Sequence, residues 1–145
     1  MKAIRVHRHG GPEVLRYEDV PDPKPAADEA VVKIEASGIN FIDIYFRTGL
    51  YKTDLPFVDG QEAAGIVAEV GSSVAEFKTG DRVAYTGALG AYAAYAAVPA
   101  AKLVKIPEGV ATRTAAAAML QGMTVHYLTH STFPLQSGQT ALIHA

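Results

Sequence analysis

One segment, residues 59–71 (DGQEAAGIVAEVG), restricts the possible folds of this chain more than any other. Its second half, residues 66–70, is rich in β-branched residues and alternates, which predicts a β-strand. The polar pair Gln61 and Glu62 comes just before that strand, between two glycines that allow a close approach to the backbone. The pair therefore indicates either a site that a ligand approaches closely or the tight beginning of a strand with one buried acid.

Similar patterns predict a mainly β structure upstream and downstream of this segment. Residues 29–36 (EAVVKIEA) alternate cleanly between apolar and charged side chains. Residues 21–28 contain three prolines, which predict an exposed connection. Residues 91–101 leave two readings open, because their alanines favour a helix whereas the glycines and the proline around them favour a strand. We expect further strands at residues 1–6, 13–20, 82–85 and 103–106.

Two helices are expected. The first covers residues 40–48, begins at Asn40 as the N-cap and ends at Gly49. The second begins at Thr112 and runs to about residue 132 through a segment rich in alanine, methionine and leucine. Tyr45 lies in the first helix and Tyr51 just beyond its end, so the two side chains can face one cleft.

The composition excludes several classes of protein. A chain of 145 residues with 49% hydrophobic and 19% charged residues can form one compact domain. A formal net charge of −2 gives no case for binding nucleic acid or an anionic membrane. No apolar run reaches the length of a membrane span, and the first residues lack the apolar stretch of a signal peptide, so we expect a cytoplasmic protein. The sequence has no cysteine, which removes disulfides, thiol nucleophiles and thiolate metal ligands.

Several separate motifs resemble one family. They match the zinc-free NADPH:quinone oxidoreductases (zeta-crystallin-like) of the medium-chain dehydrogenase/reductase superfamily. The motifs are HGGPEVL at 9–15, ASGINFID at 36–43, GINFIDIYFRTGLY at 38–51, KTGDRV at 78–83 and GAYAAY at 90–95. The resemblance implies a strand within residues 91–101.

The resemblance also implies the domain organisation. Residues 1–111 would form a GroES-like, partly open β-barrel that serves as the substrate and catalytic domain. Residues 112–145 would be a connecting helix followed, at 139–145 (QTALIHA), by the first strand of an α/β Rossmann domain that is otherwise absent. The chain would thus correspond to the N-terminal part of a longer enzyme, and we expect this part to be inactive on its own.

A zinc site is not expected. Zinc-dependent members of the superfamily carry a cysteine ligand where this chain has Asn40 and a histidine ligand where it has Gln61. Glu62 remains, but one acid without those ligands does not make a zinc site. His126 and His130 have the spacing of a two-histidine pair on a helix, yet no acidic third ligand accompanies them.

The resemblance implies a set of site residues. Asn40, Asp43, Tyr45 and Thr124 would contact the cofactor, expected to be NADPH; Tyr45 and Tyr51 would be catalytic, and Tyr51 and Gln61 would contact the substrate. Each position also has a structural reading. Asn40 suits an N-cap, Asp43 can form an ion pair with Arg47 at i,i+4 spacing, and Thr124 can bond back to its own helix. Glu62 has a minority reading as a proton relay.

The expected function is hydride transfer from NADPH to a small quinone, without metal or flavin, by a protein that forms a homodimer when full length. Two alternatives stay open. The same scaffold serves enoyl-thioester reductases, which reduce a conjugated carbon–carbon bond. Relatives with a purely structural or binding role also keep this fold, and fold alone does not decide function.

Overall fold

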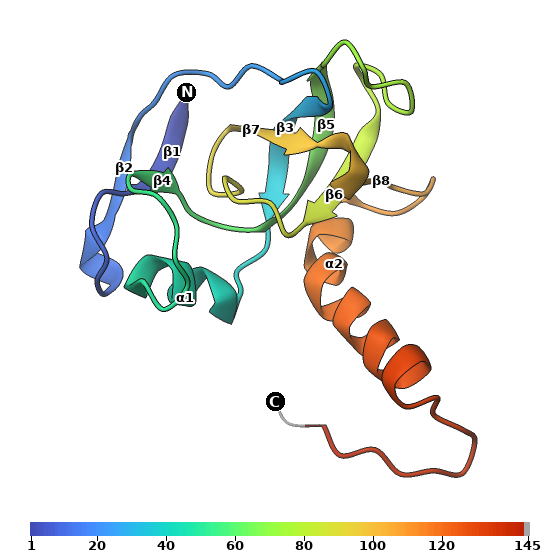
Figure 1. Cartoon of the computed structure of the whole chain (residues 1–145). Helices are drawn as coiled ribbons and strands as arrows, with labels where there is room; N and C mark the ends of the chain where they lie inside the picture. The colour runs from blue at the N-terminus through green and yellow to red at the C-terminus, as the bar shows by residue number, and fades with distance from the viewer. Residues whose placement is uncertain (144–145) are drawn as a thin grey trace.

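A computed structural model describes residues 1–143 of the chain. It contains two antiparallel sheets, which Figure 1 shows side by side, with helix α1 below the smaller sheet and helix α2 leaving from the lower end of the larger one. The smaller sheet has the order β2-β1-β4 and the larger sheet the order β7-β3-β5-β6-β8. The prediction of a mainly β structure is therefore confirmed.

The bounds of the elements follow the sequence patterns closely. The strands are β1 (Lys2–Val6), β2 (Leu15–Asp19), β3 (Glu29–Ser37), β4 (Phe57–Val58), β5 (Glu62–Val70), β6 (Arg82–Thr86), β7 (Tyr95–Pro99) and β8 (Leu103–Lys105). The helices are α1 (Phe41–Thr48) and α2 (Thr112–His126), which continues into the π-helical turn η3 (Tyr127–Thr132). Two short 3₁₀ helices, η1 (Pro12–Val14) and η2 (Ala100–Lys102), complete the set. No helix of residues 1–143 combines the length and apolarity that crossing a membrane requires.

The ambiguous segment at residues 91–101 forms a strand, but a shorter one than expected. Its first residues instead bond to the smaller sheet: Ile4 N–H donates to Tyr92 O at 2.7 Å and Ala94 N–H donates to Lys2 O at 3.0 Å. The segment thereby joins the two sheets before it enters β7. The two-residue strand β4 was not predicted, because so short a strand has no periodicity to detect.

The predicted strand at residues 139–145 is not formed within the described residues. Residues 139–143 have neither strand nor helix, and His144 and Ala145 lie outside the described part. A strand needs a neighbour to satisfy its backbone hydrogen bonds, and no other strand accompanies this segment. Its assignment to a second domain stays a prediction.

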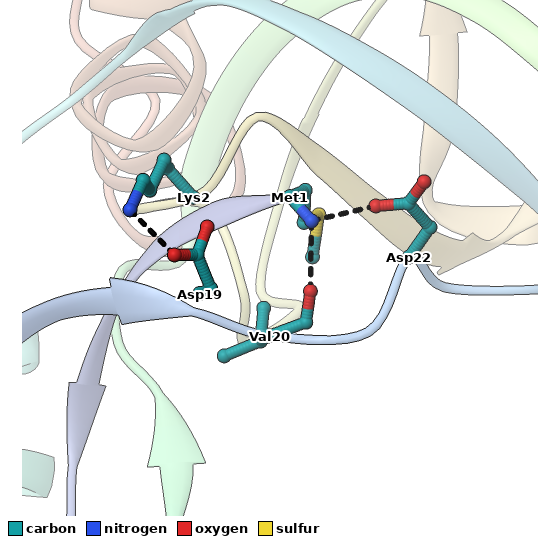
Figure 2. Close-up of polar contacts among 5 residues, drawn as sticks. All are labelled: Met1, Lys2, Asp19, Val20 and Asp22. Carbon is teal, nitrogen blue, oxygen red and sulfur yellow. Dashed lines mark hydrogen bonds and ion pairs between the residues drawn. The ribbon is translucent and has the colours of Figure 1, made fainter.

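Polar contacts close the open end of the β1–β2 hairpin (Figure 2). The ammonium group of Met1 donates to Val20 O and to Asp22 Oδ1, each at 2.8 Å. Lys2 Nζ donates to Asp19 Oδ2 at 2.7 Å. Exposed ion pairs of this kind stabilise little, so these contacts mainly fix where the exposed connection at residues 21–28 begins.

The core of the larger sheet lies on one face of β3, β5, β6 and β7. It contains Ala30, Val32, Ala63, Val67, Phe77, Val83, Tyr85, Ala88, Ala91, Ala96, Val98 and Leu103. A second cluster docks the first half of α2 onto the opposite face, through Ala64, Ala84, Ile106 and Ala116. Small side chains at this contact bring the helix close to the sheet, which matters for the polar site described below.

Close contact between β3 and β5 requires glycine at position 65. A Cβ atom there would lie 2.0 Å from the backbone oxygen of Lys33, which cannot move without disturbing the ladder. We expect Gly65→Ala to lower the free energy of unfolding by about 3 kcal/mol or more. Gly122→Ala in α2 is the matched control, because no atom lies within 4 Å of its added Cβ, and it should stabilise by up to about 1 kcal/mol. Equal denaturation midpoints for the two variants would contradict this account of β3–β5 packing.

Candidate functional site

Glu62, the first residue of β5, is the centre of a buried polar network. Its side chain is 1% exposed. Oε2 accepts a hydrogen bond from Asn40 Nδ2 at 2.8 Å, and Oε1 accepts one from the backbone N–H of Leu120 at 2.5 Å. Gln121 Nε2 in turn donates to Asn40 Oδ1 at 2.7 Å. The network therefore ties the larger sheet, the start of α1 and the middle of α2 to one another.

The chain leaves room for this carboxyl group by placing a glycine against it. A Cβ atom at Gly38 would lie 1.9 Å from Glu62 Oε2, and Gly38 N–H donates to Glu62 O at 2.9 Å. Since both carboxyl oxygens accept hydrogen bonds from fixed donors, the arrangement favours an anchoring role for Glu62 over that of a proton relay.

Asn40 occupies the predicted N-cap position of α1, and Gly49 ends the helix in the left-handed conformation at φ 82°. The polar bonds nearby differ from the prediction. Asp43 Oδ2 accepts hydrogen bonds from Asn40 N–H at 2.8 Å and from the hydroxyl of Tyr92 at 2.6 Å. The predicted ion pair between Asp43 and Arg47 is wrong, because Asp43 turns inward and Arg47 Nε donates instead to Gly10 O at 3.4 Å.

A cavity of about 390 Å³ lies beside the first turns of α1. Its apolar walls are Ile4, Leu15, Ile39 and Ile44, and its polar groups include Ser37, Asn40, Asp43, Arg47, Asp59 and Tyr92. An apolar hollow with few polar groups is the usual form of a small-molecule site. Tyr45 and Tyr51 are not among the residues that line it.

Asp59 is a buried acid on the wall of this cavity, 1% exposed. Burial raises its pKa to about 6, the nearby Asp43 adds to the rise, and the N–H of Gly60, which donates to Oδ1 at 2.8 Å, opposes it. The carboxyl group thus changes its charge close to neutral pH.

The raised pKa of Asp59 predicts how stability depends on pH. The unfolded chain loses this proton near pH 4 and the folded chain near pH 6, so unfolding releases a proton between these values. The stability due to this group is complete below the lower pKa and falls by about 3 kcal/mol as pH rises through the higher one. Asp59→Asn should remove that loss in urea denaturation measured from pH 4 to pH 8, whereas Asp28→Asn, at an exposed position, should keep it. Parallel pH profiles for Asp59→Asn and the unmodified protein would contradict the assignment.

Tyr45 and Tyr51 lie against each other, and their expected place in a shared cleft stays a prediction. Their rings meet edge to face with centroids 5.5 Å apart, and Tyr51 N–H donates to Tyr45 O at 3.1 Å. Both side chains are partly open to solvent, at 37% and 45% exposure. With Ile39, Phe41, Ile44 and Leu50, also exposed, they form an apolar surface on α1 and its flanks, which we name the α1 surface.

The remaining residues singled out in the sequence, Gln61, Thr124, His126 and His130, do not contact the tyrosine pair in the described hydrogen bonds and ring contacts. Gln61 is buried, and its Nε2 has no hydrogen-bond partner among the described residues. The hydroxyl of Thr124 donates to Leu120 O at 2.8 Å, which is the local bond that its helical position predicts. Thr124 lies three residues after Gln121, so the two share one face of α2. His126 and His130 stack with ring centroids 4.3 Å apart, and residues 1–143 contain no cluster of three potential metal ligands.

Sequence reasoning did not identify Tyr92 or Asp59 as part of the site. Tyr92 lies in the GAYAAY motif, but its spacing from Asp43 gives no local signal of their contact. The sequence did contain a signal for Asp59, because this acidic residue lies immediately before Gly60 in the glycine-flanked segment 59–71.

The comparisons with known proteins agree with this architecture. Residues 26–108 match the family model of the alcohol dehydrogenase GroES-like domain. A quinone oxidoreductase of Pseudomonas aeruginosa is 48% identical over 146 residues, which cover 99% of this chain and 45% of that protein. A 2-haloacrylate reductase of Burkholderia sp. is 38% identical over 150 residues, covering 99% of this chain and 45% of that protein.

A solved structure shows the same fold. The crystal structure of Escherichia coli quinone oxidoreductase complexed with NADPH superposes with a TM-score of 0.90 at 45% identity, covering 94% of this chain and 42% of that chain. The chain thus spans less than half the length of these relatives. It belongs to the alcohol dehydrogenase GroES-like domain family.

Proposed function

We propose that the complete protein transfers hydride from NADPH to a small quinone, and that this chain supplies the substrate side of the reaction. The observation that supports this most is the α1 surface, where two tyrosines contact each other among exposed apolar neighbours. Flat, apolar rings with a hydroxyl at the edge suit both a nicotinamide and a quinone, because they combine stacking with hydrogen bonding. The names of the quinone oxidoreductases reported above add independent support.

The side chains around Asn40 fit a nicotinamide group. The carboxamide of Asn40 is fixed by Glu62 and Gln121, yet one N–H and one oxygen lone pair remain for a ligand. When bound, NADPH supplies the hydride. We propose that Asn40, Asp43, Tyr45 and Thr124 orient the cofactor, that Tyr51 and Gln61 contact the substrate, and that Tyr45 and Tyr51 provide the platform and the donor for the developing oxyanion.

Several finer expectations belong to the same proposal. NADPH is favoured over NADH because the relative of known structure was solved with NADPH. Zinc is not required, since amide side chains at Asn40 and Gln61 are poor zinc ligands. We propose a cytoplasmic homodimer, in keeping with the composition and with the resemblance to the family.

The full-length protein, incubated with NADPH and a series of acceptors, tests the proposal. We expect rapid loss of the NADPH absorbance with 1,4-benzoquinone or 1,4-naphthoquinone. The second candidate is reduction of a conjugated carbon–carbon bond, which the 38% identical 2-haloacrylate reductase favours. A higher kcat/KM with a 2-haloacrylate or an enoyl thioester than with any quinone would replace the proposal by this alternative. No turnover with any acceptor, despite bound NADPH, would favour a binding role.

A further inference from the structure

Tyr92 is held rigidly at the junction of the two sheets. Its N–H donates to Asp59 O at 2.9 Å, and its carbonyl oxygen accepts from Ile4 N–H at 2.7 Å. Its ring lies against Gly60, where an added Cβ would be 2.5 Å from the ring. The backbone of Gly60, at φ 87°, also favours glycine. The phenol ring is therefore a fixed point of the β scaffold.

The hydroxyl of Tyr92 extends from this point to α1. It donates to Asp43 Oδ2 at 2.6 Å, and the same oxygen accepts from Asn40 N–H at 2.8 Å. Asp43 is the one buried residue of α1, all of which the structure describes. The first turn of the helix is thus attached to the scaffold by a polar chain rather than by an apolar contact.

We propose that Tyr92 is a positioning residue for hydride transfer, whose hydroxyl acts through Asp43 to hold the first turn of α1, and with it Asn40. The kinetic part of this inference rests on the proposed function, whereas the structural part does not. Burial and the bond to Asp43 raise the pKa of Tyr92, so its hydroxyl remains a donor at neutral pH. Because small displacements at a reacting centre have large effects on rate, an anchor of this kind matters for turnover more than for binding.

The variant Tyr92→Phe in the full-length protein removes the hydroxyl and keeps the ring. Tyr85→Phe is the matched control, because Tyr85 is a tyrosine of the β core whose hydroxyl has no hydrogen-bond partner among the described residues. Amide hydrogen exchange measured by NMR reports on the anchor without any assay of activity. We expect the backbone N–H of Asn40 to exchange about fivefold faster in Tyr92→Phe, and the exchange rate of the Leu120 backbone N–H to stay unchanged.

Steady-state kinetics with NADPH and 1,4-benzoquinone test the consequence. We expect kcat to fall about tenfold in Tyr92→Phe, while KM for the quinone and Kd for NADPH stay within about twofold. Asp43→Asn, a second variant, weakens the acceptor of both hydrogen bonds and should show the same faster exchange at Asn40, even if Tyr92→Phe were too unstable to study.

The outcomes separate the two proposals. Unchanged Asn40 exchange in both variants, or a kcat for Tyr92→Phe equal to that of Tyr85→Phe in an active enzyme, would overturn the positioning role. Faster Asn40 exchange in a protein that reduces no quinone would support the anchor and reject the proposed function.

Discussion

Glu62→Ala is expected to lower the free energy of unfolding by about 3 kcal/mol, since it leaves two buried donors without a partner. These donors are Asn40 Nδ2 and the Leu120 amide, which now bond to separate oxygens of the carboxyl group. Removal of a buried carboxyl group also removes its desolvation cost, which by itself would stabilise the folded protein. The small alanine side chain, however, leaves a cavity between the sheet and α2, which destabilises it. Chemical denaturation at neutral pH measures the net effect.

Glu69→Ala provides the control for this prediction. Glu69 is a glutamate of the same strand with an exposed side chain, so its removal should change stability by less than about 0.5 kcal/mol. Hydrogen exchange should also accelerate at the Leu120 amide in Glu62→Ala and not in Glu69→Ala. Equal stability of the two variants would show that Glu62 does not tie α2 to the sheet.

Tyr51→Phe in the full-length enzyme is expected to reduce quinone turnover by about a hundredfold. The ring and its edge contacts with Tyr45 and Phe46 are kept, so only a hydroxyl is lost. Removal of one donor to a developing oxyanion costs on the order of 3 kcal/mol, which corresponds to that factor in rate. Binding of NADPH should stay close to that of the unmodified enzyme, because the stacking surface is retained.

Tyr45→Phe and Tyr17→Phe are the comparisons for this variant. Tyr45 is the partner in the same ring pair, and Tyr45→Phe keeps its ring as a platform, so kcat and KM should both stay close to those of the unmodified enzyme. Tyr17 is an exposed tyrosine of β2 that is not part of the α1 surface, and its replacement should have no effect. Unmodified turnover in both Tyr45→Phe and Tyr51→Phe would mean that neither hydroxyl is a donor.

Local patterns predicted most of the secondary structure. The alternation at residues 29–36, the glycine after α1 and the prolines at residues 21–28 each depend on neighbours in the sequence, and the corresponding elements formed where expected. The segment at residues 91–101 was harder to predict, because its first part bonds to β1 and only its second part continues as β7. A choice between such partners is made in three dimensions and leaves no periodic signal.

The contacts of the site were less predictable for the same reason. Glu62 bonds to an amide 58 positions away, and Asn40 to Gln121, 81 positions away. Asp43 shows how a local rule fails: its i,i+4 neighbour Arg47 is available, but the half-buried phenol of Tyr92 is a better-placed donor. The candidate residues came from the family resemblance, whereas the network that holds them became visible only in the folded chain.

The central claim is hydride transfer to a quinone on a scaffold that uses neither zinc nor flavin. The most direct measurement is NADPH oxidation by 1,4-benzoquinone with the full-length protein after exhaustive chelation, together with elemental analysis and a visible absorption spectrum. We predict turnover within about twofold of the untreated enzyme, no stoichiometric zinc and no flavin absorbance, because Asn40 and Gln61 offer amides where a zinc site needs thiolate and imidazole. Activity that disappears on chelation and returns with added zinc, or that follows a bound flavin, would contradict the account.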